Sequence, residues 1–262
     1  MFNSHLFFHC LQYYLMSRHK YGYGIHSPFL YSLIRKCFLA KDQLFVLPEV
    51  EQLYRQLRKD NGIIPVLDLG AGSKKMTASK RKISDIARYS VMPLKYRVLL
   101  RKIITYFNPA KILELGTSLG ITALYLTVDT ATELTTVEGD KRIAALAQRN
   151  FDLFADRSRI ELVNASFEEF IEEGKYFSYD LILVDGNHTY QATLSYFEKI
   201  SSKNISGSAV WIFDDIYWSE GMTDAWKAII QKPEVTLSLD LCRLGIVFTD
   251  QNLSKQHFVI RY

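Results

Sequence analysis

The chain has 262 residues, of which 48% are hydrophobic and 23% are charged, with 13 Gly and 6 Pro. This composition suits one globular domain, or one domain with an appendage, and excludes disordered, collagen-like and low-complexity classes. The formal charge of +4 is uneven, because residues 1–110 hold 18 Lys and Arg against 6 Asp and Glu, whereas residues 111–262 hold 14 against 22. The basic first part either packs on the acidic remainder or faces an anionic partner.

The first 92 residues are predicted to form a basic, helical extension or lid. Residues 1–20 are apolar and aromatic but lack a basic start, so we expect a helix there and no signal peptide. Further helices are expected at residues 27–39 and 48–59, followed by a surface connection over residues 60–82. No run of 18 apolar residues predicts a membrane span. Three widely spaced cysteines are typical of reduced thiols and indicate a cytoplasmic protein.

Strands and helices alternate in the remainder, residues 93–262, after a helix at about 95–107. The pattern predicts an α/β fold, a doubly wound and mostly parallel sheet of seven strands. Apolar strands are expected at residues 111–115, 134–138, 159–163, 179–185 and 208–215, with two strand-like segments at 235–249 and 257–262. Helices are expected after Gly120 and at residues 140–154, 189–200 and 219–230.

A first candidate site follows the strands at 111–115 and 134–138. Ligands of such sheets bind beyond the carboxyl ends of the strands. Gly116 and Gly120 let the backbone turn sharply and approach a ligand, and Glu138 at the next strand tip can bind both hydroxyls of a ribose. The pattern predicts a nucleoside site. In the alternative interpretation, Glu138 only caps the helix at 140–154.

These segments resemble a known family. ILELGTSLGITALYL (112–126) and LTTVEGD (134–140) are similar to the first two motifs of class I S-adenosylmethionine-dependent methyltransferases, within them most of all the catechol and caffeoyl-CoA O-methyltransferase group. The resemblance covers about residues 94–249 and implies S-adenosylmethionine as cofactor. The residues that it implies for cofactor binding are Glu114, Gly116, Thr117, Ser118, Gly120, Glu138, Gly139, Ser166 and Asp185.

A second candidate site follows the strands at 179–185 and 208–215. Asp185, Asp214 and Asp215 end these strands, and each of these converging carboxylates prefers a neighbour of opposite charge, or else its pKa rises. Oxygen ligands suit Mg²⁺, Ca²⁺ or Mn²⁺, and the resemblance implies such a metal, although Asp215 stands where the family often has Asn. Alternatively, one Asp touches the cofactor and two cap the turn before the next helix.

His188 lies three residues after Asp185, where the resemblance implies a general base for the acceptor hydroxyl. A histidine of ordinary pKa can take this role. His188 and Asp185 are thus the predicted catalytic residues of an enzyme that methylates a hydroxyl of a small-molecule acceptor, with or without help from a metal. In the alternative interpretation, His188 only opens the helix at 189–200.

Other functions stay open. The basic segment with its aromatic residues would suit a nucleic-acid-binding or RNA-modifying protein. The segment Gly116–Gly120 also fits the G-x-S-x-G elbow of serine hydrolases, with Ser118 as nucleophile and His257 as base. Residues 66–73 (VLDLGAGS) look like a first methyltransferase motif too, but the basic stretch after them predicts a loop. A non-catalytic protein of this fold and a homodimer are further alternatives.

Overall fold

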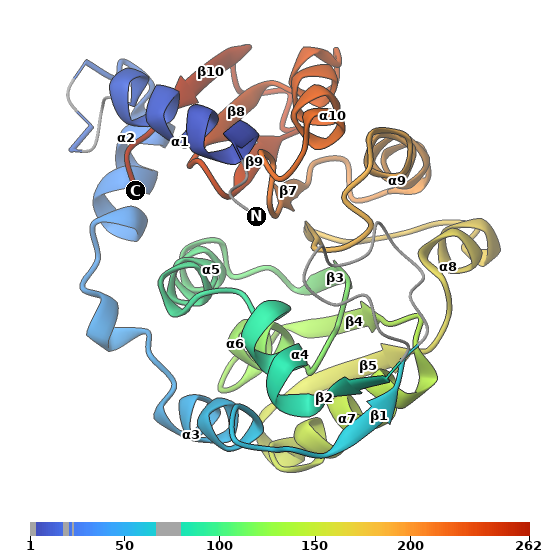
Figure 1. Cartoon of the computed structure of the whole chain (residues 1–262). Helices are drawn as coiled ribbons and strands as arrows, with labels where there is room; N and C mark the ends of the chain where they lie inside the picture. The colour runs from blue at the N-terminus through green and yellow to red at the C-terminus, as the bar shows by residue number, and fades with distance from the viewer. Residues whose placement is uncertain (1–3, 18–20, 23, 67–79) are drawn as a thin grey trace. The chain divides into compact units, whose positions relative to one another are not determined.

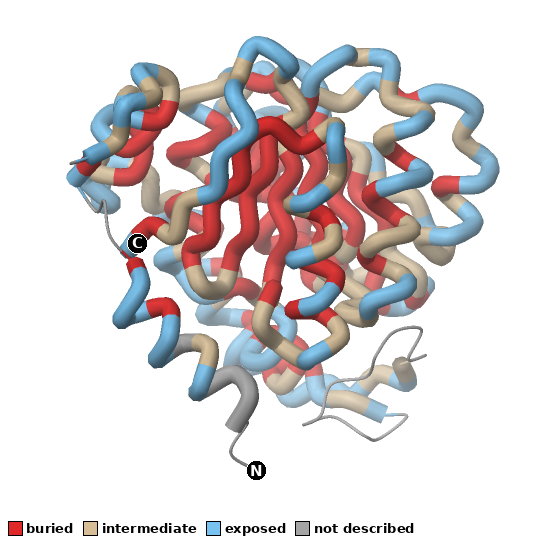
Figure 2. Tube along the Cα trace, turned by 90° about the horizontal axis from the view of Figure 1, so that it is seen from above, coloured by how far each residue is buried: buried red, intermediate tan, exposed pale blue. Residues whose placement is uncertain are grey.

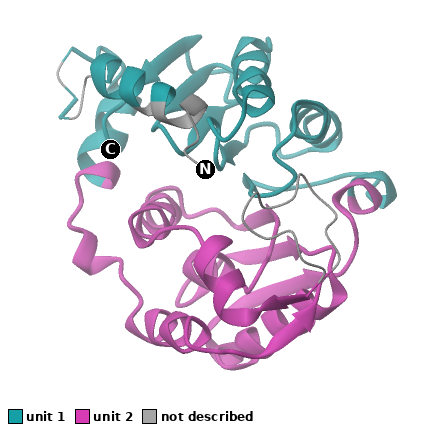
Figure 3. Ribbon diagram, viewed as in Figure 1, with its two compact units in different colours: residues 1–36, 171–262 teal, residues 37–170 magenta. Residues whose placement is uncertain are grey.

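The structure, a computed structural model, describes residues 4–17, 21–22, 24–66 and 80–262. The chain divides into two compact units (Figure 3). Unit 1 comprises residues 1–36 and 171–262, and unit 2 comprises residues 37–170. The predicted domain boundary at residues 92–93 lies inside unit 2, and it stays a prediction.

Unit 2 contains three parallel strands, β3 (Lys111–Leu115), β4 (Glu133–Val137) and β5 (Arg159–Val163) (Figure 1). Ile112 pairs with Leu134 and Leu134 with Ile160, so the three strand ends lie level. The helices and the small hairpin of unit 2 are α3 (Pro48–Leu57), β1 (Ile63–Pro65), β2 (Lys80–Lys82), α4 (Ile83–Tyr89), α5 (Leu94–Phe107), α6 (Ile121–Thr127), α7 (Lys141–Asp152) and the start of α8 (Phe167–Glu173), with 3-10 turns at Asp42–Leu44 and Ala155–Arg157.

Unit 1 contains five strands in the order β10-β8-β9-β7-β6. β6 and β7 are parallel, β9 runs antiparallel to β7 and to β8, and β10 is parallel to β8. The elements of unit 1 are α1 (Ser4–Met16), α2 (Pro28–Leu33), β6 (Leu181–Val184), α9 (Tyr190–Lys203), β7 (Val210–Phe213), α10 (Glu220–Gln231), β8 (Leu237–Asp240), β9 (Gly245–Phe248) and β10 (Gln256–Val259), and a π-helical turn, Ile34–Phe38, follows α2.

Burial follows the strands (Figure 2). Every residue of β6, β8 and β9 is buried, as expected for apolar strands covered on both faces. β5 and β10 are half-buried or exposed, and they are the two edge strands in the strand order. The apolar runs of the sequence therefore mark the centre of each unit.

Helix ends are set by local hydrogen bonds that the sequence predicts. The Asp140 side chain accepts from the backbone of Arg142 and Ile143 and so begins α7. Ser219 begins α10 in the same way, by accepting from Met222, at the start of the helix predicted for residues 219–230. These caps satisfy backbone N–H groups that have no partner within the helix.

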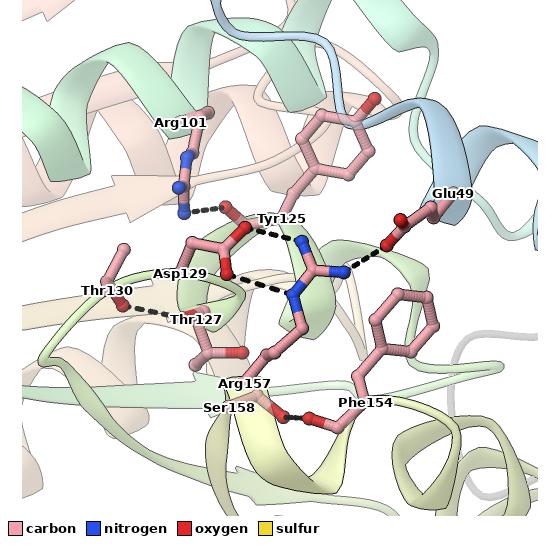
Figure 4. Close-up of polar contacts among 9 residues, drawn as sticks. All are labelled: Glu49, Arg101, Tyr125, Thr127, Asp129, Thr130, Phe154, Arg157 and Ser158. Atoms are coloured by element: carbon pink, nitrogen blue, oxygen red, sulfur yellow. Dashed lines mark hydrogen bonds and ion pairs between the residues drawn. The ribbon is translucent and has the colours of Figure 1, made fainter.

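Two arginines hold unit 2 together in different surroundings. Arg97 of α5 is fully buried, pairs with Glu51 of α3 and lies over the Tyr54 and Tyr125 rings. Arg157 is exposed and contacts Asp129 with two nitrogens at 2.9 and 2.6 Å and also Glu49 (Figure 4). The exposed pair adds little stability, whereas the buried pair must be complete, because an unpaired buried charge is costly.

The structure confirms the α/β fold with a mostly parallel sheet, but corrects the strand number from seven to eight. The tail folds into three strands, since Leu241–Leu244 turn the chain between β8 and β9. Helices α4 and α8 were not predicted, because each has only seven residues and no clear apolar stripe. Residues 67–73 of the second Gly-rich motif lie outside the described part of the chain. Among the helices that are described, none has the length and apolarity that a membrane crossing needs.

Candidate functional site

The Gly-rich turn after β3 has three residues with positive φ angles. They are Gly116 (112°), Ser118 (48°) and Gly120 (78°). Gly116 and Thr117 donate backbone hydrogen bonds to the Val137 carbonyl at the end of β4, at 3.1 and 3.3 Å. The Asn150 side chain donates to the Leu119 carbonyl at 2.9 Å. The turn is therefore held in place by β4 and α7.

Gly120 cannot carry a side chain. It is the N-cap of α6, and a Cβ atom there would lie 2.3 Å from Cε1 of Phe151 in α7. Both the φ angle and the close packing of Phe151 therefore require glycine. The sequence indicates a turn here, but not this contact, because Phe151 is 31 residues away.

Glu138 faces the Gly-rich turn. Its Oε2 accepts from the Ser118 backbone at 2.9 Å, and its Oε1 accepts from the Asp140 backbone at 3.0 Å. Burial raises the pKa of this carboxyl, although both backbone bonds act in the opposite direction. The structure thus brings the predicted turn and the predicted acid together.

Glu114 is a fully buried carboxyl at the end of β3. Its Oε2 accepts from the Thr136 hydroxyl at 2.6 Å, and that hydroxyl lies 2.6 Å from the hydroxyl of Thr117. The pKa of Glu114 is raised to about 8. Burial is the main cause and the nearby charge of Glu138 adds to it, whereas the hydrogen bond from Thr136 acts in the opposite direction. Its other oxygen, Oε1, is buried and has no hydrogen-bond partner, and the same holds for Oγ of Ser118.

Such unsatisfied buried polar atoms are rare in native proteins and call for a partner. Here both belong to residues predicted to bind the cofactor. The sulfonium and ammonium groups of S-adenosylmethionine are cations, which suit buried Glu114, and its ribose hydroxyls suit Glu138. The residues of unit 2 therefore fit this cofactor.

Gly139 and Ser166 lie in the segments that follow β4 and β5. The Asn164 side chain donates to the carbonyls of Glu138 at 2.7 Å and of Gly139 at 3.3 Å, and so joins the ends of β4 and β5. The Ser166 hydroxyl donates to Glu169 at 2.8 Å and accepts from the Glu169 backbone at 3.2 Å. This is a capping box for α8, and the spacing S-x-x-E could have shown it. Contact of Ser166 with adenine stays a prediction.

The second site lies in unit 1, where Asp185 follows β6 and Asp214 and Asp215 follow β7. The Asp214 backbone donates to the Val184 carbonyl at 3.0 Å, which sets the two strand ends side by side. Asp214 is fully buried, and Asp215 has a positive φ of 54°. Burial and the charge of Asp214 raise the pKa of Asp215 to about 7, against a lowering influence of Arg243.

Arg243 is the residue that sequence reasoning missed. It lies between β8 and β9, and its Nε and Nη2 donate to the two Asp214 oxygens at 2.7 and 2.6 Å. Nη2 also lies 3.4 Å from Oδ1 of Asp215. Arg243 is the only basic residue between Lys232 and Lys255, and this isolation in an apolar hairpin was the available signal.

The predicted metal site is not supported. A guanidinium binds both oxygens of Asp214, where a metal ligand would need a free oxygen. Among the residues that the structure describes, no three or more His, Cys, Asp and Glu side chains are grouped to hold a metal ion. The donor set therefore does not fit a divalent cation.

His188 lies beside this cluster. Its Nε2 is 3.9 Å from Oδ1 of Asp185, and its Nδ1 is buried without a hydrogen-bond partner. Burial lowers the pKa of this imidazole, the charge of Asp214 raises it, and that of Arg243 lowers it. A neutral imidazole at neutral pH can accept a proton.

The serine hydrolase alternative is not favoured. In a catalytic triad the serine hydroxyl is hydrogen-bonded to a histidine. The Ser118 hydroxyl has no hydrogen-bond partner, and His257 instead pairs its Nδ1 with the Ser238 hydroxyl at 2.8 Å. Ser118 therefore has no base of the predicted kind.

Comparisons with known proteins agree with this geometry. Residues 113–216 match a family described as a methyltransferase domain. A methyltransferase of Podospora anserina bound to S-adenosylhomocysteine superposes with a TM-score of 0.58 and 14% identity, over 77% of this chain and 88% of its own. An O-methyltransferase of Bacillus cereus in complex with the same compound gives 0.53 and 18%, over 84% and 94%.

A third similar structure is the O-methyltransferase TomG of Streptomyces achromogenes with S-adenosylmethionine, with a TM-score of 0.50 and 16% identity over 61% of this chain and 81% of its own. No curated protein sequence matches the chain. At these identities the likeness to solved structures shows the fold alone. Residues 113–216 match a methyltransferase domain, and the chain has the fold of class I S-adenosylmethionine-dependent methyltransferases.

Proposed function

We propose that the chain transfers a methyl group from S-adenosylmethionine to a hydroxyl oxygen of a small-molecule acceptor. The observation that carries this proposal is the position of Glu138, whose carboxylate accepts from the Ser118 and Asp140 backbones beside two unsatisfied buried polar atoms. The O-methyltransferases of similar fold support oxygen as the methylated atom.

Unit 2 holds the cofactor in this proposal. The cofactor supplies an electrophilic methyl group on a positively charged sulfur. Glu138 binds the ribose hydroxyls, Gly116 and Gly120 allow the backbone to approach, and Glu114 offers a buried carboxyl oxygen that has no partner in the protein. Thr117 and Ser118 lie in the same turn, Gly139 directly follows Glu138, and Ser166 is the remaining predicted contact within this unit.

Unit 1 supplies the base. Nδ1 of His188 has no partner and is the nitrogen that takes the acceptor proton, while Nε2 faces Asp185. The negative charge of Asp185, 3.9 Å from Nε2, stabilises the imidazolium that forms. A base placed in this way contributes about 10²–10⁴ in rate. No step of this mechanism requires a metal.

The cofactor assignment is tested by calorimetry with S-adenosylmethionine. Replacing Glu138 with Gln removes the negative charge and one acceptor, so we expect binding at least tenfold weaker than in the wild type. Glu133→Gln is the matched control, because Glu133 is an exposed carboxylate at the other end of the same strand. Equal affinity of the Glu138 variant and the wild type, or no binding by the wild type, contradicts the assignment.

The nucleic-acid alternative has no specific support. Two cations of the basic first part of the chain, residues 1–110, are buried within unit 2, Arg97 with Glu51 and Lys102 with Asp42 at 2.5 Å, and so do not face a partner. A cytoplasmic location and a homodimer stay predictions.

A further inference from the structure

The end of strand β7 carries more negative charge than the resemblance implies. Asp215 stands where the family often has Asn, so the adjacent Asp214 and Asp215 both carry carboxyl groups. Two adjacent carboxylates beside Asp185 repel one another unless a cation lies nearby or one of them holds a proton. We propose that the Arg243 guanidinium is this cation, and that it permanently takes the place of a divalent metal, so that the acceptor site is metal-independent.

The contacts of Arg243 favour this role. Its fork binds both oxygens of fully buried Asp214, and the same Nη2 reaches Asp215. Bidentate guanidinium–carboxylate pairs are the strongest charge-assisted hydrogen bonds in proteins. A divalent ion binds carboxylate oxygens at roughly 2.0–2.6 Å, so it would have to displace the guanidinium from Asp214.

The backbone fixes Arg243 in this position. Its carbonyl accepts from the Ile216 backbone at 3.2 Å, directly after Asp215, which joins its loop to the end of β7. On the other side, the Cys242 backbone donates to buried Asp240 at 2.8 Å. Backbone hydrogen bonds therefore hold the loop between β8 and β9, which carries Arg243, beside the end of β7.

The charge around Arg243 points the same way. Burial would lower the pKa of the guanidinium, but Asp214, Asp215 and Asp185 more than offset burial and raise it. Arg243 stays charged at every pH at which the protein folds. That these residues belong to the acceptor site rests on the function proposed above. That Arg243 replaces a metal rests only on its contacts with Asp214 and Asp215.

The test is made on the full chain, first without any acceptor. Mn²⁺ binding is followed by the electron paramagnetic resonance signal of free Mn²⁺, and thermal unfolding is followed with EDTA or with 5 mM Mg²⁺. For the wild type we expect no Mn²⁺ binding below about millimolar concentration and the same melting temperature in both buffers.

Arg243→Met removes the cation and keeps much of the side-chain volume. The uncompensated carboxylates should then lower the melting temperature, and Mn²⁺ or Mg²⁺ should restore part of it, with Mn²⁺ affinity at least tenfold above that of the wild type. The matched control is the triple variant Arg243→Met, Asp214→Asn, Asp215→Asn, which lacks the carboxylates and should show no rescue by metal.

Arg243→Lys keeps the charge but not the fork, and it serves if Arg243→Met does not fold. We expect this variant to remain insensitive to EDTA. The proposal is overturned if the wild type binds Mn²⁺ tightly and loses this binding in Asp214→Asn, or if Arg243→Met is neither destabilised nor rescued by metal. Loss of the proposed function would appear separately, as failure of wild-type protein to bind S-adenosylmethionine.

Discussion

At the scale of single residues, Glu114 shows how burial changes a carboxyl. It is fully buried and keeps one oxygen unpartnered, and its pKa of about 8 lies well above that of a free glutamate. Between the unfolded pKa of roughly 4.3 and a pH of about 8, the folded protein therefore holds a proton on Glu114 that the unfolded chain has lost. Stability from this proton is complete below the unfolded pKa of roughly 4.3 and is lost as the pH rises through 8.

Glu114→Gln tests this pH dependence. The amide cannot ionise, so we expect the stability of the variant relative to the wild type to increase as the pH rises from 5 to 9. Urea midpoints at both pH values measure the difference. The Glu133→Gln variant, which loses an exposed carboxylate on the neighbouring strand, is the control. Parallel curves for Glu114→Gln and wild type would show that Glu114 ionises normally.

At the scale of elements, the start of α6 depends on one glycine. Gly120 and Gly207 have nearly the same φ angle, 78° and 77°. An added Cβ at Gly120 would overlap Phe151 at 2.3 Å, whereas at Gly207 nothing lies within 4 Å. The two positions therefore separate backbone strain from overpacking.

Alanine at each position measures the two effects. Gly207→Ala should cost about 1–2 kcal/mol of unfolding free energy, from the left-handed backbone alone. Gly120→Ala should cost about 1–3 kcal/mol more, because Phe151 must move. Urea unfolding gives both values, and weaker S-adenosylmethionine binding should accompany only Gly120→Ala. Equal costs would mean that Phe151 yields without strain.

At the scale of the whole molecule, the predicted domain boundary at residues 92–93 can be tested. Within unit 2, α3 packs against α4 and α6, and the Tyr125 hydroxyl of α6 donates to Glu51 of α3 at 2.8 Å. Val50, Leu53 and Ile86 are buried in these helices. Each such side chain contributes about 1.5–3 kcal/mol, against a total stability of about 5–15 kcal/mol for a typical domain.

A fragment of residues 93–262 would lose α3 and α4 and leave Arg97 without Glu51. We expect it to lack a cooperative unfolding transition, which calorimetry and urea titration of the fragment and the full chain would show. A fragment that unfolds cooperatively, with a midpoint near that of the full chain, would instead establish residues 1–92 as a separate extension.

The features of this protein that depend on neighbours along the chain could be predicted from its sequence. Apolar runs placed the buried strands, Asp140 and Ser219 placed two helix starts, and the glycines placed the turn after β3. The position of Glu138 also followed, because parallel strands bring successive strand tips to one edge. Each of these features is marked by residues close together in the sequence or at a regular spacing, and can therefore be predicted without the structure.

Only the tertiary structure decided which charge neutralises which. Arg243 and Asp214 are 29 residues apart on different strand ends, and no spacing rule joins them. The sequence indicated that the carboxylates prefer a cation nearby, but it did not indicate whether this cation is a metal ion or a guanidinium. The turn between β8 and β9 brought the guanidinium within hydrogen-bond distance, and this geometry, which depends on packing and not on local pattern, changed the interpretation of the site.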